Sequence, residues 1–167
     1  MSDRLRARDL AILAAEDDGG PGHQATLEVF DPSDSGLDYD ALTRLISDRL
    51  AFVPRYRQRI VEVPGRLGTP RWIDDESFDL GFHVRRSALP RPGNEEQLRE
   101  LVGRIISRPL DRSRPLWEAL VIDGLDDGRI AFAIKVHHAI ADGVTGLELL
   151  TQILDLTVRE ALQFFSG

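Results

Sequence analysis

The sequence predicts a mixed α/β (α+β) fold, in which helices flank a mixed, largely antiparallel sheet. Segments in which apolar and polar residues alternate, as in strands, interleave with segments that have helical spacing. The chain has 167 residues, of which 42% are hydrophobic and 29% are charged, a profile typical of one globular domain with a substantial core. No apolar run reaches the roughly 18 residues that a transmembrane helix requires.

The first half of the chain is expected to alternate between helices and strands. Apolar residues recur at helical spacing in Leu5–Ala15 and Asp40–Leu50, which therefore predict two helices. Residues 31–38 are rich in Pro, Gly, Ser and Asp and predict a loop. Period-two alternation predicts strands in four segments: Ala25–Val29, Arg57–Val63, Arg71–Ile73 and Phe82–Arg85.

The second half contains a capped helix and a hairpin. Asn94 is a good N-cap and is followed by two acids, which favour the start of a helix. Trp117–Ile122 and Ile130–Val136 flank a turn-rich segment and predict an antiparallel hairpin. Further helices are predicted at Leu147–Leu154 and, after a capping box, at Ala161–Phe165.

The charge pattern excludes some classes of partner. The net charge of −7 argues against a general nucleic-acid binder. Residues 51–116 nevertheless carry thirteen arginines against nine acids. This basic segment is expected either to face an anionic ligand or lipid head group, or to form a solvated surface with local ion pairs. The absence of cysteine excludes disulfides, thiolate metal sites and cysteine nucleophiles.

The chemistry-bearing pattern is His-His-x-x-x-Asp-Gly at residues 137–143, where the last strand gives way to a helix. Neighbouring residues in an extended chain point to opposite sides, so His137 and His138 are expected to have different roles. A neutral imidazole is a suitable general base for an alcohol. Asp142 can cap the following helix or pair with a buried cation, and Gly143 permits a close backbone approach.

Two alternatives remain open for this pattern. Two histidines and an aspartate could hold a metal ion, but adjacent histidines diverge, and His23 or His83 would have to be recruited from elsewhere. We therefore expect no metal. Alternatively, both histidines are hydrogen-bonded structural groups in a turn. A serine triad and a phosphate-binding loop have no support, because neither a Gly-x-Ser-x-Gly elbow nor a glycine-rich phosphate motif is present.

The segment His137–Gly143 resembles the HHxxxDG motif of CoA-dependent acyltransferases with the chloramphenicol acetyltransferase-like fold. Flanking segments resemble the bacterial wax ester synthase/diacylglycerol acyltransferase family, in order and in spacing, over residues 5–155. These segments are Val53–Arg59, Arg71–Asp75, Phe78–Leu80, Phe82–Arg86 and Ser107–Glu118. The N-terminal pattern is weaker, since Ala7–Leu10 stands where a Ser-Pro-x-Asp-like start is common in the family.

The resemblance implies transfer of a long-chain acyl group from acyl-CoA to a fatty alcohol or to diacylglycerol. Acyl-CoA would be a co-substrate, and no bound cofactor is expected. By resemblance, His138 is the general base, Asp142 is mainly structural, and His137 and Gly143 shape the turn. Residues 115–117 match a family signature and are expected to pack beside the site.

The resemblance also bears on domain organisation. The family builds its site between two halves of similar size, and this chain would supply only the half with the motif, residues 1–155. Residues 156–167 would form a C-terminal helix at a truncation point, with the second half absent. The alternative function is therefore a non-catalytic, acyl-binding or complementing half-domain. A peptide-synthetase condensation domain is a third reading, which the flanking segments disfavour.

Partners and location follow from the same resemblance. We expect self-association or a complementary C-terminal half as protein partners, and no nucleic acid. Because the substrates are apolar, a cytoplasmic protein with peripheral contact to the inner membrane or to lipid droplets is expected. Arg55, Arg57 and Arg59 are candidates for that contact.

Overall fold

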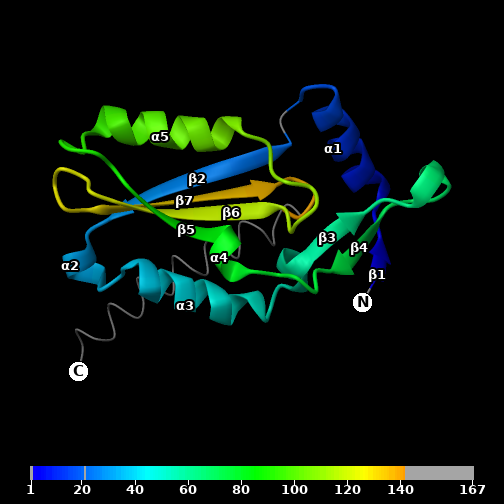
Figure 1. Ribbon diagram of the computed structural model, residues 1–167, viewed down its shortest axis with the longest axis horizontal. Helices are drawn as coiled ribbons and strands as arrows, with labels where there is room; N and C mark the ends of the chain where they lie inside the picture. The colour runs from blue at the N-terminus through cyan, green and yellow to red at the C-terminus, as the bar shows by residue number, and fades with distance from the viewer. Residues whose placement is uncertain (1, 21, 142–167) are drawn as a thin grey trace.

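The computed structural model describes residues 2–20 and 22–141, which form two sheets and their flanking helices (Figure 1). The larger sheet has the strand order β2-β7-β6-β5, and the smaller one has the order β1-β4-β3. The strands are β1 (Ser2–Arg4), β2 (His23–Phe30), β3 (Gln58–Val61), β4 (Arg71–Asp74), β5 (Val84–Ala88), β6 (Trp117–Asp123) and β7 (Ile130–His137). The helices are α1 (Ala7–Asp17), α2 (Pro32–Ser35), α3 (Tyr39–Leu50), α4 (Leu80–His83) and α5 (Glu95–Ser107), with 3₁₀ turns at Pro54–Arg57 and Pro64–Arg66.

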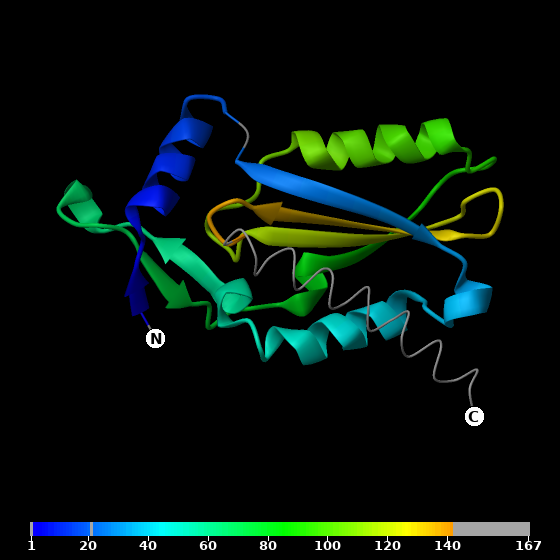
Figure 2. The same cartoon turned by 180° about the vertical axis from the view of Figure 1, so that it is seen from behind.

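The larger sheet is mixed and largely antiparallel, so the predicted fold class is confirmed. β6 and β7 form the expected antiparallel hairpin, and β2 runs antiparallel to β7. β5 lies at the edge, parallel to β6. Helix α5 covers one face of this sheet and α3 the opposite face, and the smaller sheet lies beyond one end of it (Figures 1 and 2).

The core is built on both faces of β7, every residue of which is buried. Alternate side chains point toward α3 and α5, which explains why the strand is apolar along most of its length. Toward α3, the buried side chains include Phe132, Ile134 and Trp117, together with Leu42 and Ile46 of the helix. A smaller cluster forms under α5 from Leu89, Leu98, Val102, Ile122 and Ala131.

The structure corrects three expectations. The strand predicted at Phe82–Arg85 is wrong in its first half, because Asp79 accepts the amide hydrogen of Gly81 and starts the single turn of α4. Within the predicted loop, Asp31 caps the short helix α2 in the same way. The strands predicted around residues 57–73 form a separate sheet with β1, which the sequence pattern did not indicate. The helices predicted beyond residue 141 lie outside the described residues.

Candidate active site

The two adjacent histidines lie where β7 ends in a tight turn. The carbonyl oxygen of His137 accepts the amide hydrogens of Ile140 and Ala141, each at 3.1 Å. The amide of His138 donates to the carbonyl oxygen of Gly22 at 2.9 Å, and the amide of His137 donates to that of Leu116 at 3.0 Å. Backbone hydrogen bonds to Gly22 and to Leu116 thereby hold the turn on both sides, and they set the positions of the two imidazoles.

His137 is fully buried and has both ring nitrogens engaged. The amide of Ala139 donates to Nδ1 at 3.0 Å, so Nδ1 carries no proton in this arrangement. The proton of the neutral ring therefore sits on Nε2, which donates to Oε2 of Glu16 at 3.1 Å. Burial lowers the pKa of His137, although the neighbouring Glu16 opposes the shift. His137 is thus a neutral structural group in a single tautomer.

Glu16, near the end of α1, completes a partly buried network. Besides the His137 ring, its Oε2 accepts from Nε and Nη2 of Arg112, at 3.1 and 2.6 Å. Arg112 also donates to the carbonyl oxygen of Leu13 and pairs with Asp17 at 2.9 Å. Burial would raise the pKa of Glu16, but the hydrogen bonds from Arg112 and His137 outweigh it and lower the pKa. The network joins α1, the segment before β6 and the histidine turn.

His138 differs from its neighbour, as the alternation of side chains predicts. It is only half-buried, and its ring makes no hydrogen bond with the residues that the structure describes. A half-buried histidine whose ring is not held by the described part of the chain can exchange a proton with a bound hydroxyl. The other two motif residues, Asp142 and Gly143, lie outside the described residues.

A small pocket of about 170 Å³ adjoins the turn. Ala139 and Ile140 line it together with Tyr56 and Trp72. The hydroxyl of Tyr56 is buried and has no hydrogen-bond partner within the described part of the chain, and burial raises its pKa to about 12. Trp117 fixes this tyrosine by donating from Nε1 to its carbonyl oxygen at 2.8 Å.

The signature at residues 115–117 packs beside the turn, as expected. Leu116 and Trp117 are fully buried, and Leu116 supplies the carbonyl that holds His137. The Trp117 ring stacks on His83, with 4.7 Å between ring centroids. The signature at residues 115–117 therefore packs against the histidine turn and supports it.

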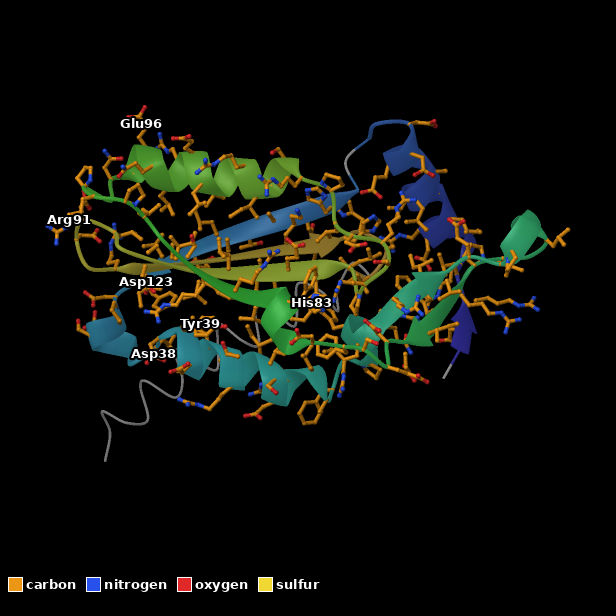
Figure 3. The ribbon with its side chains drawn as sticks, viewed as in Figure 1. Asp38, Tyr39, His83, Arg91, Glu96 and Asp123 are labelled. Atoms are coloured by element: carbon orange, nitrogen blue, oxygen red, sulfur yellow. The ribbon has the colours of Figure 1, made fainter. Side chains whose placement is uncertain are left out.

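The two remaining histidines make hydrogen bonds to backbone carbonyls, and His23 is the cross-strand neighbour of His137. Nε2 of His23 is 2.6 Å from the carbonyl oxygen of Ile106 and ties β2 to the end of α5. His83 lies at the junction of α4 and β5 (Figure 3), where its Nδ1 is 2.7 Å from the carbonyl oxygen of Trp117. Burial lowers the pKa of His83. Within residues 2–20 and 22–141, no three His, Asp or Glu side chains are grouped as metal ligands.

The arginines proposed for membrane contact are in local interactions. Arg55 lies over the Trp72 ring and pairs with Asp3 at 3.4 Å. Arg57 lies over the Phe78 ring, and Arg59 pairs with an aspartate at 3.9 Å. Within the described part of the chain, none of the helices has the length and hydropathy needed to span a membrane.

The sequence reasoning missed the Glu16–Arg112 part of the site. These residues are separated by 96 positions, and Glu16 is 121 positions from His137. Each lies in a segment whose local pattern is that of an ordinary charged surface. The sequence contains only a weak indication of this contact, namely an acid near the end of a predicted helix and an arginine within the Ser107–Glu118 segment.

Known protein families and solved structures include relatives of this chain. The family model described as the wax ester synthase/diacylglycerol acyltransferase catalytic domain matches residues 5–163. A probable diacylglycerol O-acyltransferase of Mycobacterium tuberculosis is 45% identical over 159 residues, which cover 95% of this chain and 59% of that protein. Another from the same species is 46% identical over 124 residues, which cover 74% of this chain and 27% of that protein.

Solved structures also include proteins that are similar to this chain. The wax ester synthase/diacylglycerol acyltransferase from Marinobacter aquaeolei VT8 is 34% identical, with a TM-score of 0.71, over 90% of this chain and 36% of that one. The tallysomycin biosynthesis protein TlmII, at 18% identity and a TM-score of 0.72, shares the fold. This chain thus spans 59% or less of the length of these relatives. On the family match and the identities, it belongs to the wax ester synthase/diacylglycerol acyltransferase family.

Proposed function

We propose that this chain carries the general base of an acyl-CoA-dependent O-acyltransferase, which transfers a long-chain acyl group to a fatty alcohol or to diacylglycerol. The observation that carries the proposal is the contrast between the two motif histidines. His137 is buried, neutral and fixed by Glu16, whereas His138 is half-buried and its ring has no hydrogen-bond partner among residues 2–20 and 22–141. Family membership supplies the class of substrates.

The proposed chemistry is direct transfer between the two bound substrates. His138 accepts the proton of the alcohol hydroxyl as the alcohol oxygen attacks the thioester carbonyl. The tetrahedral intermediate then expels the CoA thiolate, which takes the proton from the imidazolium. The ester and CoA are the products, and the histidine returns to its neutral form. A chain without cysteine and without an activated serine motif offers no support for an acyl-enzyme.

The test is CoA thiol release from palmitoyl-CoA in the presence of a long-chain alcohol. We expect release to depend on the alcohol and to fall by about 10²–10⁴-fold in His138→Ala, the usual contribution of a general base. His23→Gln, whose amide can still donate to the carbonyl of Ile106, is the matched control and should retain most of the activity. Equal activity of His138→Ala and the parent chain would contradict the assignment.

A second candidate function is a complementing half-domain that binds acyl-CoA but needs another segment for turnover. It is favoured by the coverage of the relatives, since the chain spans only 59% of the length of one and 36% of another. If the folded chain binds palmitoyl-CoA without releasing CoA, adding the remaining C-terminal segment of a relative should restore turnover. We expect the chain alone to self-associate in sedimentation experiments if an apolar face awaits such a segment.

Peripheral attachment in the cytoplasm, at the inner membrane or at lipid droplets, is part of the same proposal. Apolar acceptors reside in these phases, so the enzyme has to meet them at a surface. Sedimentation with anionic vesicles should remove the chain from solution, and replacing Arg55, Arg57 and Arg59 by Gln should weaken this binding. Unchanged binding would exclude these arginines as the contact.

A further inference from the structure

A second, larger pocket lies between α5 and the sheet, on the face opposite α3. Its volume is about 400 Å³, within the range of roughly 300–1,000 Å³ typical of small-molecule sites. The apolar part of its lining comes from the inner side of α5 and from β6 and β7. These residues include Leu101, Val102, Ile105, Leu120 and Ala133. We call this site the α5 pocket.

A buried cation lines the α5 pocket. Lys135 of β7 is only 2% exposed, and its Nζ donates to the carbonyl oxygens of Ile105, at 2.9 Å, and Arg108. An ammonium has three N–H donors, so one remains without a partner among residues 2–20 and 22–141. Both partners are neutral, and burial lowers the pKa of Lys135. A buried charge without an opposite charge is unfavourable, so a bound anion would stabilise it.

The acids near Lys135 do not neutralise the pocket. Glu118 lies opposite Lys135 in the sheet, but it pairs with Arg85 at 3.3 Å. Arg108 also lines the pocket. The lining therefore combines four cationic side chains with one carboxylate that is already paired. Of these four, Arg86 is paired with Asp123 at 2.6 Å.

We propose that the α5 pocket binds a fatty carboxylate, with the carboxylate at Lys135 and the acyl chain along the apolar lining. The combination of an apolar cavity and a buried ammonium whose hydrogen-bond partners are both neutral fits an anionic single-chain ligand better than an uncharged one. Such a ligand is neither the thioester substrate nor the ester product of the proposed reaction. The binding site is also distinct from the turn that presents His138, although Lys135 precedes His137 by two residues on β7.

The test uses the full 167-residue chain and needs no turnover, so its failure is separable from failure of the proposed transferase activity. The fluorescence of bound cis-parinarate is measured, and laurate is added as the competitor. We expect laurate to displace the probe, and dodecanol, which lacks the charge, to bind about tenfold or more weakly. Coenzyme A without an acyl chain should not compete. Competition by coenzyme A alone, or equal affinity for laurate and dodecanol, would overturn the proposal.

Two variants locate the site. Lys135→Met keeps the length of the side chain but removes the charge, and should weaken laurate binding by about tenfold or more, as expected for loss of a charge-assisted hydrogen bond. Ala25→Phe leaves Lys135 intact and fills the pocket beside it, since Ala25 is the cross-strand neighbour of Lys135. It should abolish binding even if Lys135→Met folds poorly.

Arg104→Met, on the exposed surface of α5, is the matched control. Unchanged laurate affinity in a folded Ala25→Phe or Lys135→Met chain would refute the site.

Discussion

At the residue scale, the role of His137 depends on one carboxylate. Replacing Glu16 by Ala removes the acceptor of the His137 Nε2–H group and leaves that donor buried without a partner. This change should cost about 1–3 kcal/mol of unfolding free energy, the usual cost of an unsatisfied buried donor. Denaturant titration measures it, and ¹⁵N NMR of the imidazoles reports whether the proton has left Nε2.

Asp17→Ala is the matched control for this prediction, because Asp17 also pairs with Arg112 but is largely exposed and does not contact the histidine. An exposed ion pair contributes about 0–1 kcal/mol, so the control should lose little stability and keep the tautomer of His137. Equal losses in the two variants would show that Glu16 acts through Arg112 alone, and not through the histidine.

The same residues show what local patterns can predict. The different environments of His137 and His138 agree with their adjacency at the end of a strand, because this requires only the alternation of side chains. The partner of His137 could not be predicted, since Glu16 lies 121 positions away and has no distinctive neighbours. Contacts across such separations are set by how α1 packs against the sheet, which the spacing of apolar residues does not specify.

At the scale of elements, the start of α5 is joined to the β6–β7 loop through a glycine. The carbonyl oxygen of Gly93 accepts the amide hydrogen of Asp126 at 2.9 Å, and Gly93 has a φ of +76°. A Cβ at this position would lie 1.9 Å from the carbonyl oxygen of Gly124, so the loop would have to move. We expect Gly93→Ala to destabilise the chain by about 3 kcal/mol, through strain and overpacking together.

Gly128 provides the comparison, because it also has a positive φ, of +78°, but an added Cβ would meet nothing within 4 Å. Gly128→Ala should therefore cost only the backbone strain, about 1–2 kcal/mol. Urea unfolding of the two variants measures the difference. Similar costs would mean that the close approach at Gly93 relaxes easily and does not fix the position of α5.

Elements with a clear periodic spacing of apolar residues were predictable from the sequence, and short elements were not. Helix α3 and the β6–β7 hairpin have enough residues for periodicity to show, and Asn94 caps α5 as its side chain suggests. The single turn of α4 has four residues, and its start depends on a hydrogen bond from one backbone amide to Asp79. In the smaller sheet, β1 pairs with β4 across about seventy positions, and a three-residue strand carries no pattern that predicts this pairing.

At the scale of the whole molecule, two buried histidines make folding sensitive to pH. His83 and His137 are almost fully buried, and burial lowers the pKa of each below the ordinary value of 6.5. The unfolded chain therefore binds protons at these positions before the folded chain does. Their contribution to stability is complete above pH 6.5 and is lost as the pH falls toward the folded-state pKa values.

We therefore expect the free energy of unfolding to fall below pH 6.5, with a slope of up to about 1.4 kcal/mol per pH unit for each histidine. Glu16 adds to the loss below pH 4.5, since its folded-state pKa is lowered.

His83→Phe keeps the stacking on Phe78 and Trp117 but cannot titrate, so it should reduce the slope between pH 6.5 and 5 relative to the parent chain. His23→Gln removes a histidine whose Nδ1 has no partner among the described residues, and it serves as the control. A slope that is the same in His83→Phe and in the parent would mean that the folded protein accommodates a charged His83, which would contradict the tight stacking and burial of its ring.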